Sequence, residues 1–515
     1  MIEPSIIMRK TIRSWGTALW LCTASFTFSQ QDTPNIIYFL ADDLGYGEVG
    51  AYGQEKIKTP NIDTLVASGM KFTQHYSGAP VCAPARYILL TGKHAGHAYI
   101  RGNDEWAERG EVWDYEKMFV NPGLEGQRPI PDSTVTLAEL LKTKGYATGI
   151  FGKWGLGAPN TEGVPNQQGF DEFYGYNCQR QAHNLYPGHL WHNDKKVLLH
   201  NELIAPHQPL DSLADPFDEK SYARFAQKEY APTLIHEKAL VFIEKNQDQP
   251  FFLYYASPLP HLPLQAPTEL VEAYRELFGE EKPYVGDKGY FPNRYPRATY
   301  AAMISYLDQQ LGELVAKLKA LGLYGNTLII FSSDNGATYT GGGDYDFFES
   351  ADPFGNGYGR TKGFVYEGGI RVPMVASWPG HIKPGSSTDH ISAFYDVLPT
   401  LCDVAEIEPP TNVDGLSFAP TLLGKQQPQH DFLYWEFPSY KGQQAVRMGK
   451  WKGIRKNIFE GNMKLELYNL ETDIGETTDV ADQHPEIVAQ IEAIMQQEHT
   501  PSENKKFWFA VLGDR

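Results

Sequence analysis

The stretch Asn35–Asp43, NIIYFLADD, decides the fold class because a short apolar run ends directly in two carboxylates. Three other runs share this short, β-rich and mostly uninterrupted character: Tyr146–Phe151 (YATGIF), Phe251–Ala256 (FFLYYA) and Thr327–Ser332 (TLIIFS). Such runs are typical of strands that are covered on both faces of a sheet. We therefore predict that Asn35–Leu40 and these three runs are central strands of one mainly parallel sheet.

Apolar residues between these runs recur at helical spacing. Leu137–Leu141 contains one such series before Gly145, and a longer series from Ile304 to Leu321 precedes Gly322. A glycine directly after periodic apolar residues is a common helix end. The alternation of strands and helices over about the first 400 residues predicts βαβ units, and hence an α/β fold with a mixed, mainly parallel sheet between helices.

The pattern changes after about residue 400. Gln444–Ile454 (QAVRMGKWKGI) and Lys464–Leu470 (KLELYNL) have the pattern of strands in a smaller antiparallel sheet. A last helix is predicted to begin after Pro485, with an apolar face made by Ile487, Val488, Ile491, Ile494 and Met495. We predict a large catalytic domain over residues 31–400 and a smaller C-terminal α+β domain over residues 401–515.

The first 30 residues have the order of a secretory signal peptide. Arg9, Lys10 and Arg13 precede a mostly apolar stretch, Trp15–Phe28, and a polar segment, Ser29–Gln31, follows it. We predict that residues 1–30 are removed during export across a bacterial inner membrane. The mature chain is then expected in the periplasm or outside the cell.

Two alternatives for this segment fit its residues less well. A membrane anchor needs about 20 apolar residues, and threonines and serines dilute this run. A lipoprotein would be modified at Cys22, but Leu21 stands where a small residue is expected. No later stretch is long and apolar enough to span a bilayer, so we expect a soluble mature chain.

Charge and cysteine content exclude several classes of protein. The chain has 45 Lys and Arg residues against 63 Asp and Glu residues, a net charge of −18. This balance disfavours nonspecific binding to nucleic acid, and an anionic substrate would need a local basic pocket. Cys22, Cys82, Cys178 and Cys402 are too scattered for a disulfide scaffold. A disulfide between Cys178 and Cys402 stays open, because it needs Cα atoms within about 7 Å.

A polar group follows each of the four predicted strands: Asp42–Asp43, Lys153, His261 and Asp334–Asn335. In open α/β sheets, ligands bind outside the carboxyl ends of the strands, so these groups describe one pocket. The two acidic pairs supply only oxygen ligands, which favours a hard cation such as calcium or magnesium over zinc. Such a cation would act as a Lewis acid on an oxygen of a bound anion.

The most specific signal is Cys82–Gly92, CAPARYILLTG, which has the pattern C-x-P-x-R-x-x-x-x-T-G. It resembles the motif of the formylglycine-dependent type I sulfatases. The resemblance implies that a formylglycine-installing maturation enzyme oxidises Cys82 to formylglycine (3-oxoalanine). A hydroxyl of the hydrated aldehyde would attack sulfur, the second hydroxyl would expel sulfate, and Arg86 would hold the modified side chain. For Cys82 alone, the alternative is a buried free thiol.

The resemblance covers about Asn35 to Val480 and implies an alkaline-phosphatase-like fold. It implies a site for Ca²⁺, or alternatively Mg²⁺, made by Asp42, Asp43, Asp334, Asn335 and the converted Cys82. It also implies sulfate-binding and acid/base roles for Lys153 in GKWG, His261 in PHLPLQAP and Lys362 in TKGFVYEGG. Two lysines beside the metal would offset the negative charge of a sulfate and of its transition state.

The chain departs from the family at Gly155, because many sulfatases have GKWHLG where this chain has GKWGLG. We hypothesise that His183 in NCQRQAHN replaces the missing histidine, with a solvated loop histidine as the alternative. The leaving group needs a general acid, for which His261 and His183 are the candidates. We also predict that four side chains bind substrate, namely His97, Arg180, His183 and Trp191.

These features together predict an exported enzyme that hydrolyses sulfate esters of a sulfated polysaccharide or its oligosaccharides. Algal polysaccharides such as ulvan or carrageenan, glycosaminoglycans and mucin glycans all stay open as substrates. The alternatives are a phosphodiesterase or phosphonate monoester hydrolase of the same superfamily, and a noncatalytic glycan-binding protein. The sequence has no evident Asp-x-x-x-His pair for a two-metal phosphatase site, and its intact motif argues against a purely binding role.

Overall fold

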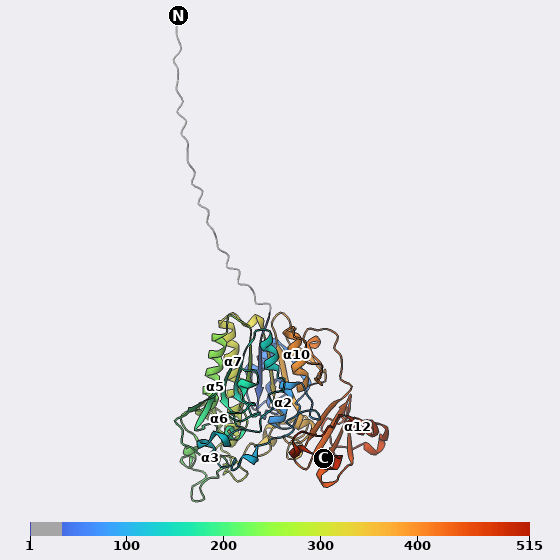
Figure 1. The fold of residues 1–515 in the computed structure, drawn as a ribbon. Coiled ribbons are helices and arrows are strands. Elements are labelled where there is room, and N and C mark those ends of the chain that lie inside the picture. Colours follow the sequence, from blue (N-terminus) through green and yellow to red (C-terminus); the bar gives the residue numbers. More distant parts are fainter. Residues whose placement is uncertain (2–32) are drawn as a thin grey trace. The chain divides into compact units, whose positions relative to one another are not determined.

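The run NIIYFLA forms β1 (Asn35–Ala41), which lies in the middle of a large mixed sheet (Figure 1). The computed structural model describes Met1 and residues 33–515, and residues 33–515 form one compact unit. Apart from Met1, the predicted signal peptide over residues 1–30 lies outside the described residues.

The four strands predicted from the sequence are neighbours in this sheet. β8 (Thr327–Ser333), β1, β7 (Phe251–Ala256) and β3 (Ala147–Lys153) lie side by side and run parallel. The full strand order is β10-β2-β9-β8-β1-β7-β3-β4-β5-β6, and β11 pairs with β2. The remaining strands are β2 (Met70–Tyr76), β4 (Glu172–Tyr176), β5 (His189–His192), β6 (Lys195–Leu198), β9 (Arg371–Ser377), β10 (Ser386–Thr388) and β11 (Ser392–Ala393). The prediction of a mainly parallel sheet is confirmed, since its antiparallel pairs are limited to β2–β9, β8–β9, β4–β5 and β5–β6.

Alternate side chains of β1 enter two hydrophobic cores, one on each face of the sheet. Ile36 and Tyr38 belong to one core, and Ile37 and Phe39 belong to the other. This is the period of two that a strand imposes, and all four side chains are buried because both faces are covered.

Helices cover both faces (Figure 1). The first core includes residues of α2 (Cys82–Thr91), α4 (Leu137–Thr143) and α10 (Val397–Val404). The second core includes residues of α1 (Pro60–Ser68), α5 (Ala231–Lys245) and α7 (Pro296–Ala320), and α6 (Thr268–Phe278) packs along α7. The other helices of this part are short: α3 (Tyr115–Val120), α8 (Tyr345–Phe348), α9 (Glu367–Ile370) and α11 (Ala419–Leu422). The predicted architecture of a sheet between helix layers is confirmed.

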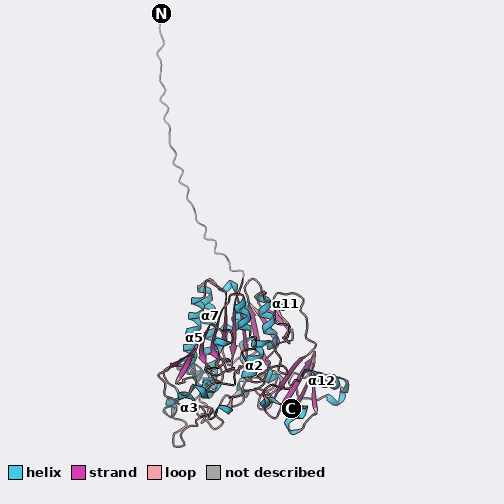
Figure 2. Cartoon of the chain, in the orientation of Figure 1, coloured by secondary structure: helices cyan, strands magenta, loops and turns pink. Residues whose placement is uncertain are grey.

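A second, antiparallel sheet is built from β12 (Leu433–Phe437), β13 (Gln443–Met448), β14 (Trp451–Lys456) and β15 (Leu465–Asn469) (Figure 2). α12 (Pro485–Glu498) packs on it through Ile491 and Met495. The stretch 444–454 holds parts of two strands, because Gly449, at a positive φ of 55°, turns the chain between β13 and β14. A glycine adopts this conformation without the steric cost that other residues meet.

The predicted domain division after residue 400 falls inside α10 (Val397–Val404), and the second sheet begins at β12. The division at this position therefore stays a prediction. In the described part of the chain, no helix combines the length and the apolar character that crossing a membrane requires.

Candidate active site

The parallel strands bring the predicted polar groups together at one edge of the sheet. Asp42 and Asp43 follow β1, Lys153 ends β3, His261 follows β7, and Asp334 and Asn335 follow β8. The backbone locks these strand ends together, because the Asp42 N–H donates to the Leu259 carbonyl (2.8 Å) and the Asp334 N–H donates to the Ala41 carbonyl (3.0 Å). We use the name Asp42 cluster for these side chains and those joined to them below: Asp42, Asp43, Cys82, Arg86, Lys153, His261, Asp334, Asn335 and Lys362.

The two carboxylates after β1 are buried and held in different ways. Asp43 has a φ of 67°, in the left-handed region that aspartate tolerates better than most residues. Its backbone N–H donates to Asp334 Oδ1 (3.1 Å), and its side chain accepts a hydrogen bond from Asn335 Nδ2 (2.8 Å). These two hydrogen bonds hold the Asp43 carboxylate beside Asp334 and Asn335.

Cys82 is the first residue of α2 and points at these carboxylates. Its Sγ lies 3.4 Å from Asp42 Oδ1 and 4.0 Å from Asp43 Oδ1. Burial raises the pKa of the Cys82 thiol, by more than Lys153 and Lys362 lower it, so the unmodified side chain is a protonated thiol. A buried, protonated thiol is a poor nucleophile, which fits a residue whose chemistry depends on conversion to another group.

The rest of the Cys82–Gly92 motif builds the helix that presents Cys82. Arg86 lies one turn further along the same face, and its guanidinium donates to Asp334 Oδ2 from Nε (3.1 Å) and Nη2 (2.9 Å) and to the Lys153 carbonyl from Nη1 (2.6 Å). Gly92 ends the helix in the left-handed conformation, with a φ of 69°. Arg86 therefore ties α2 to the ends of β8 and β3, which fixes the distance between Cys82 and the carboxylates.

Two lysines pair with the two carboxylates. Lys153 Nζ lies 2.5 Å from Asp42 Oδ2, and Lys362 Nζ lies 2.6 Å from Asp43 Oδ2. Burial opposes the charged form of both lysines, but Asp42 raises the pKa of Lys153 and Asp43 raises the pKa of Lys362. Both side chains are therefore ammonium groups, and Lys362 is the more accessible of the two, with a side chain that is 15% exposed against 1% for Lys153.

The donor set of the cluster suits a hard divalent cation. One ligand atom each from Asp42, Asp43, Cys82 and His261 lie within 4.8 Å of one another. Asn335 Oδ1 is buried and has no hydrogen-bond partner in the described part of the chain, although Asn335 Nδ2 has two. An orphaned amide oxygen beside carboxylates is a typical ligand for calcium or magnesium, so the residues fit the metal that the sequence predicts.

Two histidine rings cover one side of the cluster. His261 Nδ1 donates to the Leu262 carbonyl (2.7 Å), which leaves Nε2 facing Asp43 Oδ2 at 3.6 Å. The His183 ring stacks on the His261 ring with centroids 5.0 Å apart, and His183 Nδ1 contacts His207 Nε2 (3.0 Å). Burial and then the nearby lysines hold the pKa of His261 well below its usual value, and burial and then His261 do the same for His183.

Gln179 occupies the space that a side chain at position 155 would enter. Gly155 has a φ of 80°, and a Cβ added there would lie 2.4 Å from Gln179 Nε2. His183 comes from the same short 3-10 turn as Gln179 (Gln179–His183) and reaches His261 instead. This position is compatible with the hypothesis that His183 replaces the missing histidine, which stays a prediction.

Three residues predicted to bind substrate have their contacts elsewhere in the described chain. Arg180 is paired with Glu105 and lies over the ring of Trp113. The indole N–H of Trp191 donates to Glu125 Oε1 (2.6 Å). His97 Nδ1 contacts Asp414 Oδ1 (3.0 Å). Their roles toward a substrate stay predictions. Cys178 and Cys402 are both free and buried.

Sequence reasoning missed two residues that line the cluster. The Tyr290 ring packs against His183 and His261, with centroids 5.2 and 5.9 Å away, and His207 contacts His183. Both stand in loop segments without strand or helix periodicity, so no local pattern marks them. Asn103 also contacts the first turn of α2, because its Oδ1 accepts a hydrogen bond from the Ala83 N–H (3.2 Å).

Comparison with known proteins gives a family for this arrangement. Residues 34–407 match the Sulfatase family, and residues 358–502 match the family described as N-sulphoglucosamine sulphohydrolase, C-terminal. Arylsulfatase A of Bos taurus is 31% identical over 84% of this chain and 78% of the relative. N-acetylgalactosamine-6-sulfatase of Mus musculus is 30% identical over 88% of this chain and 79% of the relative.

A solved structure extends the likeness to three dimensions. The crystal structure of Ps i-CgsB in complex with k-i-k-neocarrahexaose is 27% identical, covers 94% of this chain and 98% of that chain, and superposes with a TM-score of 0.70. The sulfatase fold is thus matched over nearly the whole described chain. From the matched domain, the relatives and the Cys82 motif on its helix, we conclude that the chain belongs to the formylglycine-dependent sulfatase family and is a sulfuric ester hydrolase.

Proposed function

We propose that this chain is an exported bacterial sulfatase that removes sulfate esters from a sulfated polysaccharide or its oligosaccharides. Its nucleophile would be the hydrate of a formylglycine made from Cys82, and its metal would be Ca²⁺, with Mg²⁺ as the alternative. The observation that carries the proposal is the position of Cys82 Sγ, 3.4 Å from Asp42 Oδ1 at the centre of the Asp42 cluster. Export rests on the signal-peptide pattern of residues 1–30 alone.

The charges of the cluster support sulfate as the ligand. Three carboxylates, Asp42, Asp43 and Asp334, are balanced by three cations, Arg86, Lys153 and Lys362. A divalent cation and the released sulfate dianion would add equal and opposite charges, so the site would stay neutral with the product bound. Neutrality matters because an unbalanced charge in a buried site costs several kcal/mol (about 3–5) when its partner is missing.

The side chains divide the chemical work by position. A bound cation would polarise a sulfate oxygen and favour deprotonation of the nucleophile. Lys153 and Lys362 donate to the sulfate oxygens and stabilise the charge that grows in the transition state. His261 presents Nε2 to the same space, held by the hydrogen bond from its Nδ1 to the Leu262 carbonyl, and would carry a proton to or from the leaving oxygen. Arg86 keeps residue 82 in place.

The substrate class rests on the relatives. The solved structure of Ps i-CgsB holds k-i-k-neocarrahexaose, and N-acetylgalactosamine-6-sulfatase is named for a sulfated sugar. By this likeness, we propose a sulfated carbohydrate as the substrate of this chain. Carrageenan and other algal polysaccharides such as ulvan come first, followed by glycosaminoglycans and mucin glycans.

The test is sulfate release from a panel of sulfated oligosaccharides of these classes, run beside a phosphate diester and a phosphonate monoester. We expect free sulfate from at least one oligosaccharide, lost on chelation and restored by Ca²⁺. Faster hydrolysis of the phosphate diester or the phosphonate than of every sulfate ester would instead assign the enzyme to the alternative class. Binding of glycans without release of any product would favour the noncatalytic alternative.

A further inference from the structure

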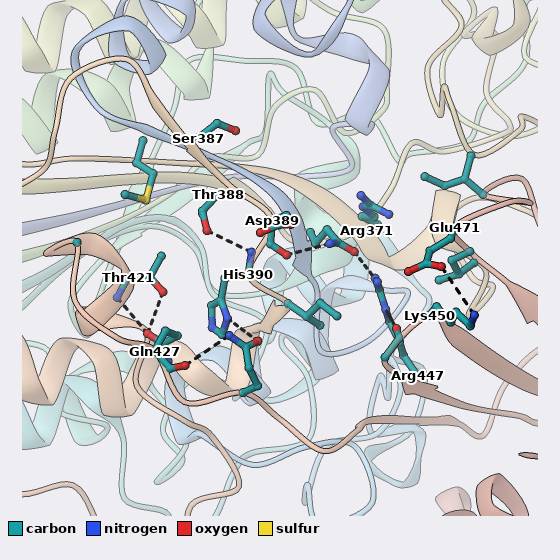
Figure 3. A pocket seen from close by; sticks show the side chains of 18 of the residues that line it. Arg371, Ser387, Thr388, Asp389, His390, Thr421, Gln427, Arg447, Lys450 and Glu471 are labelled. Carbon is teal, nitrogen blue, oxygen red and sulfur yellow. Dashed lines mark hydrogen bonds and ion pairs between the residues drawn. The ribbon is translucent and has the colours of Figure 1, made fainter.

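A large cavity lies away from the Asp42 cluster and shares none of its residues (Figure 3). Its volume is about 930 Å³. The walls come from β2 and β10 of the large sheet, from β13 and the β13–β14 turn of the small sheet, and from segment 421–429. We call it the Arg447 cavity, and its labelled lining residues are Arg371, Ser387, Thr388, Asp389, His390, Thr421, Gln427, Arg447, Lys450 and Glu471.

Arg447 of β13 lines this cavity and is only 5% exposed. Its Nε donates to the Gly449 carbonyl (3.1 Å), Nη1 contacts the Tyr76 hydroxyl, and Nη2 contacts Gln74 Oε1. These contacts use three of the five N–H groups of the guanidinium. Within residues 33–515, no carboxylate lies at ion-pair distance from Arg447. A buried arginine with only neutral partners is unusual, because buried charges are normally paired.

The surroundings of Arg447 confirm the surplus of positive charge. Lys452 lies 2.8 Å from both Glu367 and Glu476, and Arg371 lies 3.1 Å from the same Glu367. Lys452 and Arg371 therefore take up both carboxylates, and neither pairs with Arg447. The cavity lining itself holds four cations, Arg371, Lys425, Arg447 and Lys450, against two carboxylates, Asp389 and Glu471. Burial lowers the pKa of Arg447 to about 10, as expected for a guanidinium whose hydrogen-bond partners are all neutral. In a chain with a net charge of −18, this local excess stands out.

The opposite wall of the cavity offers a different kind of group. His390 is 6% exposed, and its Nδ1 contacts Gln429 Oε1 (3.1 Å). Because Gln429 Oε1 is an acceptor, Nδ1 carries the proton, and Nε2 is a buried acceptor without a partner in the described chain. Thr388, Thr421 and Gln427 add neutral polar groups along this wall, which Figure 3 shows on the side away from Arg447. Neutral acceptors and donors of this kind suit hydroxyl groups.

The dimensions then point to a ligand larger than an ion. Ligand pockets for small molecules typically span about 300–1,000 Å³, and the Arg447 cavity lies within that range. The ligand must combine an anionic group for Arg447 with hydroxyl groups for the His390 wall. We propose that the Arg447 cavity is a second, noncatalytic binding site for a sulfate group, carried on a saccharide or free as the released ion, and that Arg447 is its anchor.

The test measures binding directly and is independent of turnover. Hydrogen exchange of the full mature chain is followed by mass spectrometry in a Lys362→Ala background, which weakens the active site. The probes are inorganic sulfate, a carrageenan-derived sulfated oligosaccharide and its desulfated form. We expect the sulfated probe to protect the amides of β10 (Ser386–Thr388) and of the β13–β14 turn. Arg447→Gln should weaken this binding at least tenfold, and Arg455→Gln, a buried arginine of the next strand that is paired with Glu492, should not.

The outcomes are distinguishable. Protection by the oligosaccharide identifies a saccharide site, and protection by inorganic sulfate alone identifies a site for the released ion. Equal protection by the desulfated probe, no protection by any probe, or unchanged binding in Arg447→Gln would overturn the proposal. If Arg447→Gln does not fold, the same binding is measured with Lys450→Glu, a change at an exposed residue of the cavity lining. The added carboxylate should weaken binding of the sulfated probe several-fold, and unchanged binding would overturn the proposal. If the parent enzyme releases no sulfate but the sulfated probe still protects the cavity amides, the proposed function fails and the binding site in the Arg447 cavity stands.

Discussion

The Asp42 cluster and the Arg447 cavity differ in their balance of positive and negative side chains. In the cluster, three carboxylates face three cations, and each lysine has a carboxylate within 2.6 Å. Around the cavity, Arg447 has only neutral partners within residues 33–515, and the lining holds four cations against the two carboxylates Asp389 and Glu471. A balanced site can hold a cation and an anion together without a net charge. An unbalanced site needs an anion, so it is expected to bind one. The difference separates a place for chemistry from a place for binding alone.

The largest effect is expected from Cys82→Ala, which removes the nucleophile and leaves the charges of the cluster unchanged. Sulfate release should fall by about 10⁵-fold or more, as for removal of a catalytic nucleophile in other hydrolases. The melting temperature should change little. The matched control is Cys402→Ala, another buried free cysteine, in α10. Residual activity of Cys82→Ala within tenfold of the parent would rule out the assigned nucleophile.

Lys362→Ala breaks the balance of the Asp42 cluster by one charge. We expect sulfate release to fall about 100- to 1,000-fold, as for loss of one group that stabilises transition-state charge. Lys441→Ala is the control, because Lys441 is exposed and paired with Glu460 on the surface. Steady-state rates on one oligosaccharide measure both variants. If the two variants kept similar activity, Lys362 would have no part in the reaction.

A third pair of variants tests whether Gln179 fills the space beside Gly155. Gly155 and Gly145 have nearly the same φ, 80° and 81°, but a Cβ meets Gln179 at Gly155 and nothing within 4 Å at Gly145. Both changes to alanine meet the left-handed penalty of about 1–2 kcal/mol. Gly155→Ala should lose about 1–3 kcal/mol more in unfolding free energy from overpacking. In the double variant, Gln179→Ala should recover the stability that Gly155→Ala loses through overpacking. Equal losses of unfolding free energy at Gly155 and Gly145 would show that Gln179 does not crowd position 155.

A pH-dependent effect concerns His75 on β2, a buried group with no charged partner within residues 33–515. Its Nδ1 contacts Ser392 Oγ (2.9 Å), and burial, followed by His390, lowers its pKa from 6.5 to about 3. The unfolded chain therefore binds a proton below pH 6.5 that the folded chain does not bind. Folding stability should be complete above this pH and fall by about 1.4 kcal/mol per pH unit as the pH drops toward 3.

Denaturant unfolding at several pH values measures this slope. His75→Gln should be less stable at pH 8 and should show a flatter loss between pH 6.5 and about 5. A parent and a variant with the same slope would show that another group controls acid stability. The comparison with Arg447 is direct, because both side chains are buried beside neutral partners, yet only the histidine can lose its proton.

The Asp42 cluster could largely be predicted from the sequence because its residues stand at strand ends. Asp42, Lys153 and Asp334 each end or follow a parallel strand, and topology alone brings such positions to one edge. Arg86 follows Cys82 by four residues on one helix, so local spacing also places it. The central strands were also predictable, because a short, uninterrupted run of β-branched and aromatic residues is typical of a strand covered on both faces.

The remaining features depend on contacts that no local pattern encodes. Arg447 becomes unusual only because Tyr76 and Gln74, from a distant strand, meet it in place of a carboxylate. Tyr290 and His207 join His183 through loops without periodicity. Trp191 stands among polar residues in the sequence, which favoured contact with a sugar. In the structure it is only 5% exposed, and its indole N–H donates to Glu125 Oε1. In each case the tertiary partner, rather than the residue type, decides the environment.

The central claim is that residue 82 acts after conversion to formylglycine within a charge-balanced cluster. The most direct measurement compares two preparations of the same chain, one made with a formylglycine-installing enzyme and one made without it. The mass of the peptide containing Cys82 identifies the state of residue 82, and sulfate release from a sulfated oligosaccharide measures its activity. We predict that only the converted preparation releases sulfate, in proportion to the converted fraction. Equal sulfate release by both preparations would contradict the account.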